Sequence, residues 1–299
     1  MKVVLAGGSG FLGGALRQAL LGDGHAVANL TRGTPRVSGD ITWTPDGTAS
    51  GAWVSAIDDV DAVVNLAGEG IADARWSDAR KQSLLQSRVA ATRSLVAAIT
   101  QAAKPPTVFV SASGIGYYGP RGDEPVTEAT PAGSDFLAHV CVEWEREAEQ
   151  AASVTRVTLV RSGMVLHPEG GALGKMLLPF QLGVGGPIGS GTQWTPWIHR
   201  DDWVDLARWM MAEPAARGAF NACAPDPIRN KDFARALGRA LGRPAFMPVP
   251  AFGLRILFGE MSEILLSGQR AKPARALELG FRFRFQRLDD ALAHLFSRT

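Results

Sequence analysis

The chain has 299 residues, which suits one large domain or a large domain with a smaller one. Hydrophobic residues make up 46% and charged residues 20%, and the formal net charge of +2 gives no reason to expect nucleic acid or an anionic membrane as a partner. The two cysteines, Cys141 and Cys223, exclude a disulfide framework or a cysteine-rich metal centre and predict a reducing, cytoplasmic location.

Short apolar runs alternate with longer helical patterns over the first 165 residues. The apolar runs are residues 3–6, 26–30, 62–66, 107–110 and 157–160, and the helical patterns are residues 11–21, 77–99 and 135–152. Uniformly apolar strands separated by helices predict a parallel sheet covered on both faces. We therefore expect an α/β fold with a Rossmann-type, doubly wound sheet in residues 1–165.

The pattern changes after Arg161. Residues 168–198 are rich in glycine and proline, as segments that cover a site often are. Helical patterns return at residues 201–212, 231–241, 252–266 and 288–296, while the strict alternation of FRFRF at 281–285 predicts a strand. We expect residues 166–299 to form mainly a smaller C-terminal α/β substrate domain, with residues 200–225 returning to the first domain. No run of about 18 apolar residues occurs, so no membrane span is expected.

The sequence GGSGFLG places Gly7, Gly10 and Gly13 between the first apolar run and the first helical pattern. Glycines allow the backbone to turn tightly and to approach a pyrophosphate without a Cβ clash. The N–H groups at the start of the following helix then face the anion. This strand–loop–helix context predicts a dinucleotide site.

The end of the second apolar run distinguishes between cofactors. Sites for NAD usually have an acidic residue there, which binds the ribose 2′-hydroxyl. Here the segment ends in Thr31 and Arg32 without an acid, and Arg36 follows. An arginine can bind a 2′-phosphate through charge-assisted hydrogen bonds, so we expect NADP(H) rather than NAD.

The motifs GGSGFLG, NLAG (65–68) and WIHRDD (197–202) resemble those of extended short-chain dehydrogenases/reductases. The longer segments 75–92, 178–199 and 247–295 are similar to an atypical subgroup, the epimerase family proteins of the short-chain dehydrogenase 39U type. Members of that subgroup carry a C-terminal extension of unassigned role. The resemblance implies a modified Rossmann domain and a smaller domain that closes a substrate cleft, without supplying a substrate.

The resemblance also implies cofactor contacts along the chain. Arg88 replaces the asparagine that most relatives have on the long helix, and it could reach the cofactor or form a surface ion pair. Residues 162–165, Val165 among them, would lie near the nicotinamide, and Ser111 would be a further cofactor contact. The other implied contacts are Gly7, Ser9, Gly10, Phe11, Leu12 and Gly13 at the pyrophosphate, Thr31 and Arg32 at the adenosine phosphate, and Leu66, Ala67 and Gly68 along the adenine and ribose.

The usual catalytic pair of the family is missing. Typical members use Tyr-x-x-x-Lys, in which tyrosine transfers the proton and lysine lowers its pKa. Here Cys141 and Glu145 occupy those positions. The candidate catalytic residues are Ser113, Tyr117 and Cys141, each with a purely structural alternative.

Several other residues can be interpreted as either structural or functional. Tyr118 matches a Tyr-Gly motif that is largely structural in relatives. Glu145 could simply lie on the surface of its helix. His199 could act in catalysis or shape the base of the substrate domain. Trp194 and Trp197 could form a stacking wall or pack the domain junction. No metal ligand set is expected.

Two functions remain open from the sequence. The first is an NADP(H)-dependent oxidoreductase or epimerase that acts on a small, sugar-like or nucleotide-like substrate. The second is a non-catalytic module that senses NADP(H), which the missing Tyr-x-x-x-Lys motif favours. The oligomeric state is also open from the sequence, although relatives often form homodimers through the helices that correspond to 77–100 and 135–152.

Overall fold

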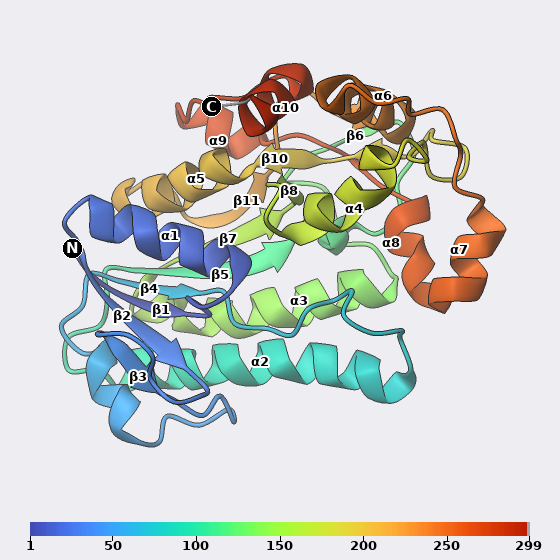
Figure 1. Ribbon diagram of the computed structural model, residues 1–299. Helices are drawn as coiled ribbons and strands as arrows, with labels where there is room; N and C mark the ends of the chain where they lie inside the picture. Colours follow the sequence, from blue (N-terminus) through green and yellow to red (C-terminus); the bar gives the residue numbers. More distant parts are fainter. Residues whose placement is uncertain (298–299) are drawn as a thin grey trace.

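A seven-stranded sheet forms the centre of the computed structural model, which describes residues 1–297 (Figure 1). All its neighbouring strands are parallel, and their order is β11-β7-β5-β4-β1-β2-β3. The strands are β1 (Lys2–Ala6), β2 (Ala26–Thr31), β3 (Asp40–Thr42), β4 (Ala62–Asn65), β5 (Val108–Gly114), β7 (Arg156–Ser162) and β11 (Gly218–Ala222). From β1 the chain first adds β2 and β3 along one edge direction of the sheet. It then returns to add β4, β5, β7 and β11 in the opposite direction. Ligands of open α/β sheets bind beside such a switch point, at the carboxyl ends of the strands.

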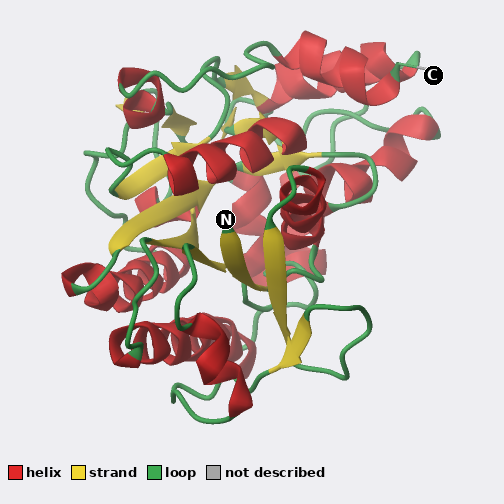
Figure 2. Ribbon diagram, turned by 90° about the vertical axis from the view of Figure 1, so that its left-hand side faces the viewer, coloured by secondary structure: helices red, strands yellow, loops and turns green. Residues whose placement is uncertain are grey.

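Helices cover both faces of this sheet (Figures 1 and 2). The helices are α1 (Phe11–Gly22) and α5 (Arg200–Ala212) on one face, and α2 (Asp78–Gln101) and α3 (Phe136–Glu149) on the other. The strand β1 shows how the sequence fills both cores. Val3 and Leu5 pack in the core under α1 and α5, while Val4 and Ala6 pack in the core against α2. The predicted Rossmann-type sheet is therefore confirmed.

Short 3-10 helices connect several of these elements. They are η1 (Ala52–Ile57), η2 (Ile115–Tyr118), η3 (Gln150–Ser153) and η4 (Gly259–Ser262). The segment 200–225 supplies α5 and the edge strand β11, which pairs with β7. The domain limits themselves remain a prediction.

A smaller C-terminal region lies beside the carboxyl ends of the central strands. Its helices are α4 (Gly171–Gln181), α6 (Asn230–Leu241), α7 (Ala251–Phe258), α8 (Glu263–Leu266), α9 (Ala274–Glu278) and α10 (Leu288–Phe296). Its two-stranded sheets are β8 (Met164–Leu166) with β10 (Trp197–His199), β9 (Trp194–Thr195) with β12 (Ile228–Arg229), and β6 (Pro125–Val126) with β13 (Arg270–Ala271). Phe180, Phe233 and Leu292 belong to a separate core in this region.

The prediction of a strand at residues 281–285 is wrong. Phe281 and Phe283 are buried, as the alternation predicts, but the segment pairs with no strand among the described residues. The backbone N–H groups of Arg284 and Phe285 instead donate to the Asp202 carboxylate, at 2.7 and 2.9 Å. A buried carboxylate therefore satisfies the amides that a neighbouring strand would otherwise bind.

The helix predicted over residues 252–266 is interrupted. It divides into α7, η4 and α8, and the break begins at Gly259, where φ is +60°. That left-handed conformation ends an α-helix because its carbonyl and amide no longer continue the hydrogen-bond ladder.

No helix within residues 1–297 is both long enough and apolar enough to cross a bilayer.

Candidate functional site

The glycine-rich loop between β1 and α1 is held by very close backbone approaches. Gly7 has a φ of +85°, and a Cβ there would lie 2.7 Å from the carbonyl oxygen of Leu66. A Cβ on Gly13 would lie 2.2 Å from the carbonyl oxygen of Gly7. Side chains at these two positions would therefore displace backbone, which explains the need for glycine.

The N-terminus of α1 is open to an anion. Gly10 is the N-cap, no side chain caps the helix, and its first turn contains no acidic residue. The first N–H groups of a helix lack intrahelical partners, and the helix dipole adds positive charge there. Ser9 and Gly10 are exposed, and Phe11 and Leu12 are half-buried. The loop therefore fits a diphosphate, as the sequence predicts.

The segment after β4 lies against this loop. Asn65 is fully buried; its Nδ2 donates to Thr92 Oγ1 at 2.8 Å and its Oδ1 accepts from the Ala67 N–H at 3.1 Å. These bonds fix Leu66, Ala67 and Gly68 beside Gly7. The three residues expected along the adenine and ribose are thereby brought to the edge of the loop.

Arg88 lies against the same segment, since a Cβ on Gly68 would be 3.2 Å from Arg88 Cγ. Its side chain is buried, and its guanidinium donates to the carbonyl oxygens of Leu84 and Glu69, both at 2.9 Å. The guanidinium carbon lies 5.1 Å from the Trp144 ring. The surface ion-pair alternative for Arg88 is wrong, because the side chain is enclosed and bonded to carbonyl groups.

The end of β2 presents an exposed arginine without a competing acid. Arg32 forms no ion pair within residues 1–297, and Thr31 Oγ1 accepts from the Gly33 N–H at 3.4 Å. Asp40 of β3 is the nearby acid, but its carboxylate accepts from Asn29 Nδ2 and the Arg36 N–H, each at 2.9 Å. These hydrogen bonds, that of the Arg36 N–H first, lower the pKa of Asp40. Asp40 thus braces the loop, and Arg32 remains available to a phosphate.

Replacing Arg32 tests the preference for the phosphorylated cofactor. The Arg32→Ala variant should bind NADPH roughly 10- to 100-fold more weakly, because a hydrogen bond to a charged group contributes about 1.5–3 kcal/mol. Its NADH affinity should not change. Titration calorimetry with both dinucleotides measures the difference, and Arg282→Ala, at an exposed arginine without an ion pair in the described part, is the control. Equal losses for NADPH and NADH would contradict the assignment.

A buried polar network lies at the carboxyl ends of β5 and β7. Ser113 Oγ donates to Glu145 Oε1 at 2.6 Å. Arg161 binds the same carboxylate through two bonds, Nε to Oε1 at 2.8 Å and Nη2 to Oε2 at 2.7 Å. Ser113, Glu145 and Arg161 are only 5–6% exposed. Glu145 does not cover a helix surface, because it forms a buried bidentate ion pair.

Two tyrosines enclose Arg161. The Arg161 guanidinium carbon lies 3.4 Å from the centre of the Tyr117 ring. Arg161 Nη1 donates to the Tyr118 hydroxyl at 2.9 Å, and that hydroxyl donates to Asn221 Oδ1 at 2.7 Å. Burial raises the pKa of Tyr118 to about 12. Tyr118 therefore keeps its proton at neutral pH, which agrees with a structural role.

Cys141 lies next to this network and is not activated. Its Sγ is 3.6 Å from the Gly114 carbonyl oxygen. Burial, followed by the charge of Glu145, raises the pKa of Cys141 to about 11. The thiol is therefore neutral at physiological pH, and it lacks the thiolate that a nucleophile requires. A catalytic role for Ser113, Tyr117 or Cys141 remains a prediction.

Ser111 and Val165 are both buried. Ser111 is fully buried on β5, and its Oγ has no hydrogen-bond partner within the described residues. Val165 of β8 is buried and pairs with Ile198 of β10. Their contact with a bound cofactor remains a prediction.

His199 and the two tryptophans have well-defined surroundings. His199 caps α5, its Nδ1 accepting from the Asp201 N–H at 3.0 Å, and its Nε2 lies 3.2 Å from Nδ1 of His294. Burial lowers the pKa of His199 to about 4, so the ring is neutral. Trp197 is buried in the C-terminal core. Trp194 is half-buried, with the Arg229 guanidinium 4.0 Å from its ring.

Sequence reasoning missed Arg161, the centre of the network. Its signal was an arginine inside the apolar strand VTLVRS, opposite Ser113 in the sheet register. The sequence showed Glu145 at the position of the family's lysine, but it did not indicate an ion pair with Arg161. A charge within a buried strand implies a buried partner, but the sequence does not identify the partner.

The fold and site together define a dinucleotide-binding α/β protein of the extended short-chain dehydrogenase/reductase class. The loop at the carboxyl end of β1, the neighbouring segment after β4 and the C-terminal region beside them are the features on which this class depends. Comparison with known proteins agrees. The model of the NAD dependent epimerase/dehydratase family matches residues 3–223, and a domain of unknown function matches residues 249–295.

The chain belongs to the NAD dependent epimerase/dehydratase family and, within it, to the SDR39U1-type epimerase family proteins. It is 40% identical to the human epimerase family protein SDR39U1, covering 99% of each chain. It is 41% identical to a chloroplastic homologue from Arabidopsis thaliana, covering 98% of this chain and 86% of that one. The crystal structure of the human protein with NADPH matches with a TM-score of 0.93 at 39% identity, covering 100% of both chains. The predicted family is therefore confirmed.

Proposed function

We propose that this protein is an NADP(H)-dependent oxidoreductase or epimerase that acts on a small hydroxyl- or carbonyl-bearing substrate. The observation that carries the proposal is the open, glycine-bounded N-terminus of α1 together with a polar network at the carboxyl ends of β5 and β7. The human relative was solved with NADPH, and Arg32 supplies a free cation for the extra phosphate. When bound, the nicotinamide supplies or accepts a hydride.

In this proposal Ser113 binds the substrate oxygen. Its hydroxyl proton is donated to Glu145, so the oxygen keeps lone pairs that can accept a hydrogen bond from a substrate hydroxyl. Glu145 and Arg161 are positioning residues, because their bidentate pairing fixes the acceptor that orients Ser113. A sugar-like or nucleotide-like substrate supplies the hydroxyl groups that this arrangement accommodates.

Replacing Ser113 tests this role. The Ser113→Ala variant should lower kcat/KM by roughly 10²- to 10⁴-fold, the usual contribution of a proton-handling side chain. NADPH affinity should be retained, because the loop at Gly7 is untouched. Loss of absorbance at the nicotinamide band, measured over a panel of carbonyl compounds, gives the rate, and Ser55→Ala is an exposed control. Turnover unaffected by Ser113→Ala would contradict the role, and tight NADPH binding with no turnover of any compound would contradict the enzyme.

A non-catalytic NADP(H) sensor is the second candidate. The observation that favours it is the state of the residues at the usual Tyr and Lys positions, a neutral buried thiol at Cys141 and an ion-paired carboxylate at Glu145. The carboxylate at Glu145 cannot supply the positive charge by which the usual lysine lowers the pKa of its neighbour. A sensor must bind NADP⁺ and NADPH with different affinities or change shape between them. Calorimetry showing equal affinities, with identical scattering profiles, would exclude it.

A further inference from the structure

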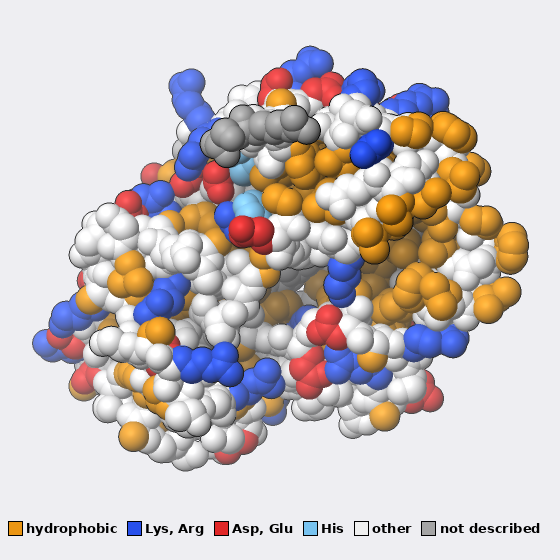
Figure 3. All heavy atoms as spheres, viewed as in Figure 1, with side chains coloured by type: hydrophobic (Ala, Val, Ile, Leu, Met, Phe, Trp, Pro, Cys, Tyr) orange, Lys and Arg blue, Asp and Glu red, His pale blue; other side chains and the backbone are white. Residues whose placement is uncertain are grey.

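A large group of apolar side chains is exposed on the C-terminal region, over α4 and α7 (Figure 3). In α7 only Leu254 is buried, while Phe252 and Ile256 are 69% and 72% exposed. Single exposed apolar residues are common, but contiguous patches mark interaction sites. The apolar members of this surface, here called the α4–α7 face, are Leu178, Leu182, Val184, Phe246, Met247, Phe252, Ile256 and Leu257.

The segments that carry these residues are joined into one surface. The Val249 N–H donates to the Pro187 carbonyl oxygen at 2.8 Å, and the Gly189 N–H donates to the Val249 carbonyl oxygen at 2.9 Å. A Cβ on Gly183 would lie 3.7 Å from the Pro244 ring. The loop after α4 therefore runs beside the loop that leads into α7, so the exposed side chains of both segments are neighbours.

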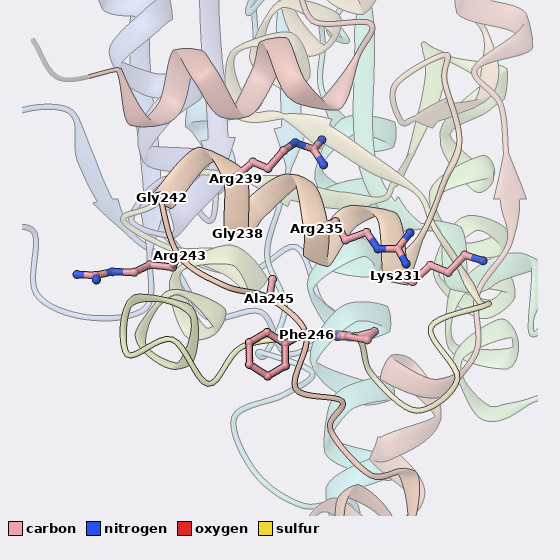
Figure 4. Close-up of a pocket in the computed structure, with 9 residues that line it drawn as sticks. Lys231, Arg235, Gly238, Arg239, Gly242, Arg243, Ala245 and Phe246 are labelled. Atoms are coloured by element: carbon pink, nitrogen blue, oxygen red, sulfur yellow. The ribbon is translucent and has the colours of Figure 1, made fainter.

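A basic stripe borders the same face. Lys231, Arg235, Arg239 and Arg243 recur at every fourth residue along α6 and its C-terminal end, and all four are exposed (Figure 4). Together with Phe246 they line a hollow of about 580 Å³, and no acidic residue is among its described lining residues. Arg235 and Arg239 also line a second groove, where they pair with Asp232 and Asp289, whereas Lys231 and Arg243 form no ion pair within the described residues.

We propose that the α4–α7 face and the α6 stripe bind the surface of an anionic lipid bilayer. Exposed phenylalanine and aliphatic side chains beside lysines and arginines are the combination by which proteins lie in a membrane interface. The apolar side chains insert at the headgroup boundary, and the cations meet lipid phosphates. The net charge of +2 did not predict such a partner, because a sum over the whole chain does not show where the lysines and arginines gather.

Self-association explains the surface less well. A two-fold contact between two α4–α7 faces would bring the two basic stripes towards each other, and like charges across an interface oppose association. An acidic protein could satisfy the cations. However, Leu254 is the one buried residue of α7, and its exposed Phe252, Ile256 and Leu257 side chains can enter a bilayer without a shaped partner.

Vesicle sedimentation of the full chain tests the proposal. The protein should sediment with phosphatidylcholine vesicles that contain phosphatidylglycerol, not with phosphatidylcholine alone, and added salt should weaken binding. The variants Phe252→Ser/Ile256→Ser and Lys231→Glu/Arg235→Glu should each bind at least about tenfold more weakly. The controls Leu277→Ser and Arg282→Glu, on other surfaces, should bind normally. Thermal unfolding and NADPH titration establish that every variant is folded.

Three results would overturn the proposal. The first is no sedimentation with either vesicle. The second is binding that both surface variants retain, which would place the contact elsewhere. The third is full competition by free glycerol phosphate, which would indicate a small-anion site in the hollow. Loss of a dimer in the Phe252→Ser/Ile256→Ser variant, with no vesicle binding by the parent chain, would instead assign the face to a second copy.

Discussion

The Gly13→Ala variant is expected to bind NADPH at least about 100-fold more weakly than the parent protein. The new Cβ would lie 2.2 Å from the Gly7 carbonyl oxygen and 2.8 Å from the Gly8 Cα. Both are backbone atoms, so relief of the clash must move the loop that faces the diphosphate. Each hydrogen bond to a charged group contributes about 1.5–3 kcal/mol, so loss of one or two of the loop's bonds to the diphosphate amounts to about 10²-fold. Titration calorimetry with NADPH measures the loss.

The neighbouring glycine provides a matched control. A Cβ on Gly14 would lie 3.7 Å from the Gly8 carbonyl oxygen, which is an ordinary contact. Gly14→Ala should therefore keep the NADPH affinity, and it should stabilise α1 by about 1 kcal/mol because alanine is the better helix former. If Gly13→Ala and Gly14→Ala bind NADPH equally well, the loop does not hold the diphosphate in the way proposed.

The Glu145→Gln variant is expected to lower the free energy of unfolding by about 3–5 kcal/mol. Glu145 and Arg161 are 6% and 5% exposed and share a bidentate pair. Removal of one charge leaves the Arg161 guanidinium buried without a counter-charge, and that desolvation is costly. The remaining partners of Arg161, including the Tyr118 hydroxyl, are neutral. Equilibrium unfolding in urea, followed by circular dichroism, measures the change.

Two further variants separate the buried charge from a general effect of the substitution. Glu147→Gln, on the same helix, removes the partner of Arg93, whose side chain is 52% exposed, and should cost less than about 1 kcal/mol. The double variant Glu145→Leu/Arg161→Met should recover much of the lost stability, because it leaves no isolated charge. A Glu145→Gln protein as stable as its parent would show that Arg161 does not need the carboxylate.

The sequence by itself determined the central sheet and the diphosphate loop. Uniformly apolar strands can only be buried on both faces, which fixes a parallel sheet between helices. Gly7, Gly10 and Gly13 stand between the first strand and the first helix, an order that leads directly to an anion site. These features are local in the chain, so periodicity and spacing reveal them. The resemblance to the 39U-type subgroup likewise depends on continuous sequence segments.

The tertiary structure alone decided the chemistry of the polar network. Ser113, Glu145 and Arg161 come from β5, α3 and β7, and only the sheet register and the packing of α3 bring them together. The same reason explains the missing strand at 281–285. There the backbone N–H groups of Arg284 and Phe285 donate to Asp202, which lies on α5, far away in sequence. The α4–α7 face was also hidden, because its residues come from segments far apart in sequence, 178–184 and 246–257, which lie side by side only in the folded chain. Contacts between residues far apart in sequence depend on how the elements pack. A single sequence shows which residues are present, but it does not show which of them pair with each other.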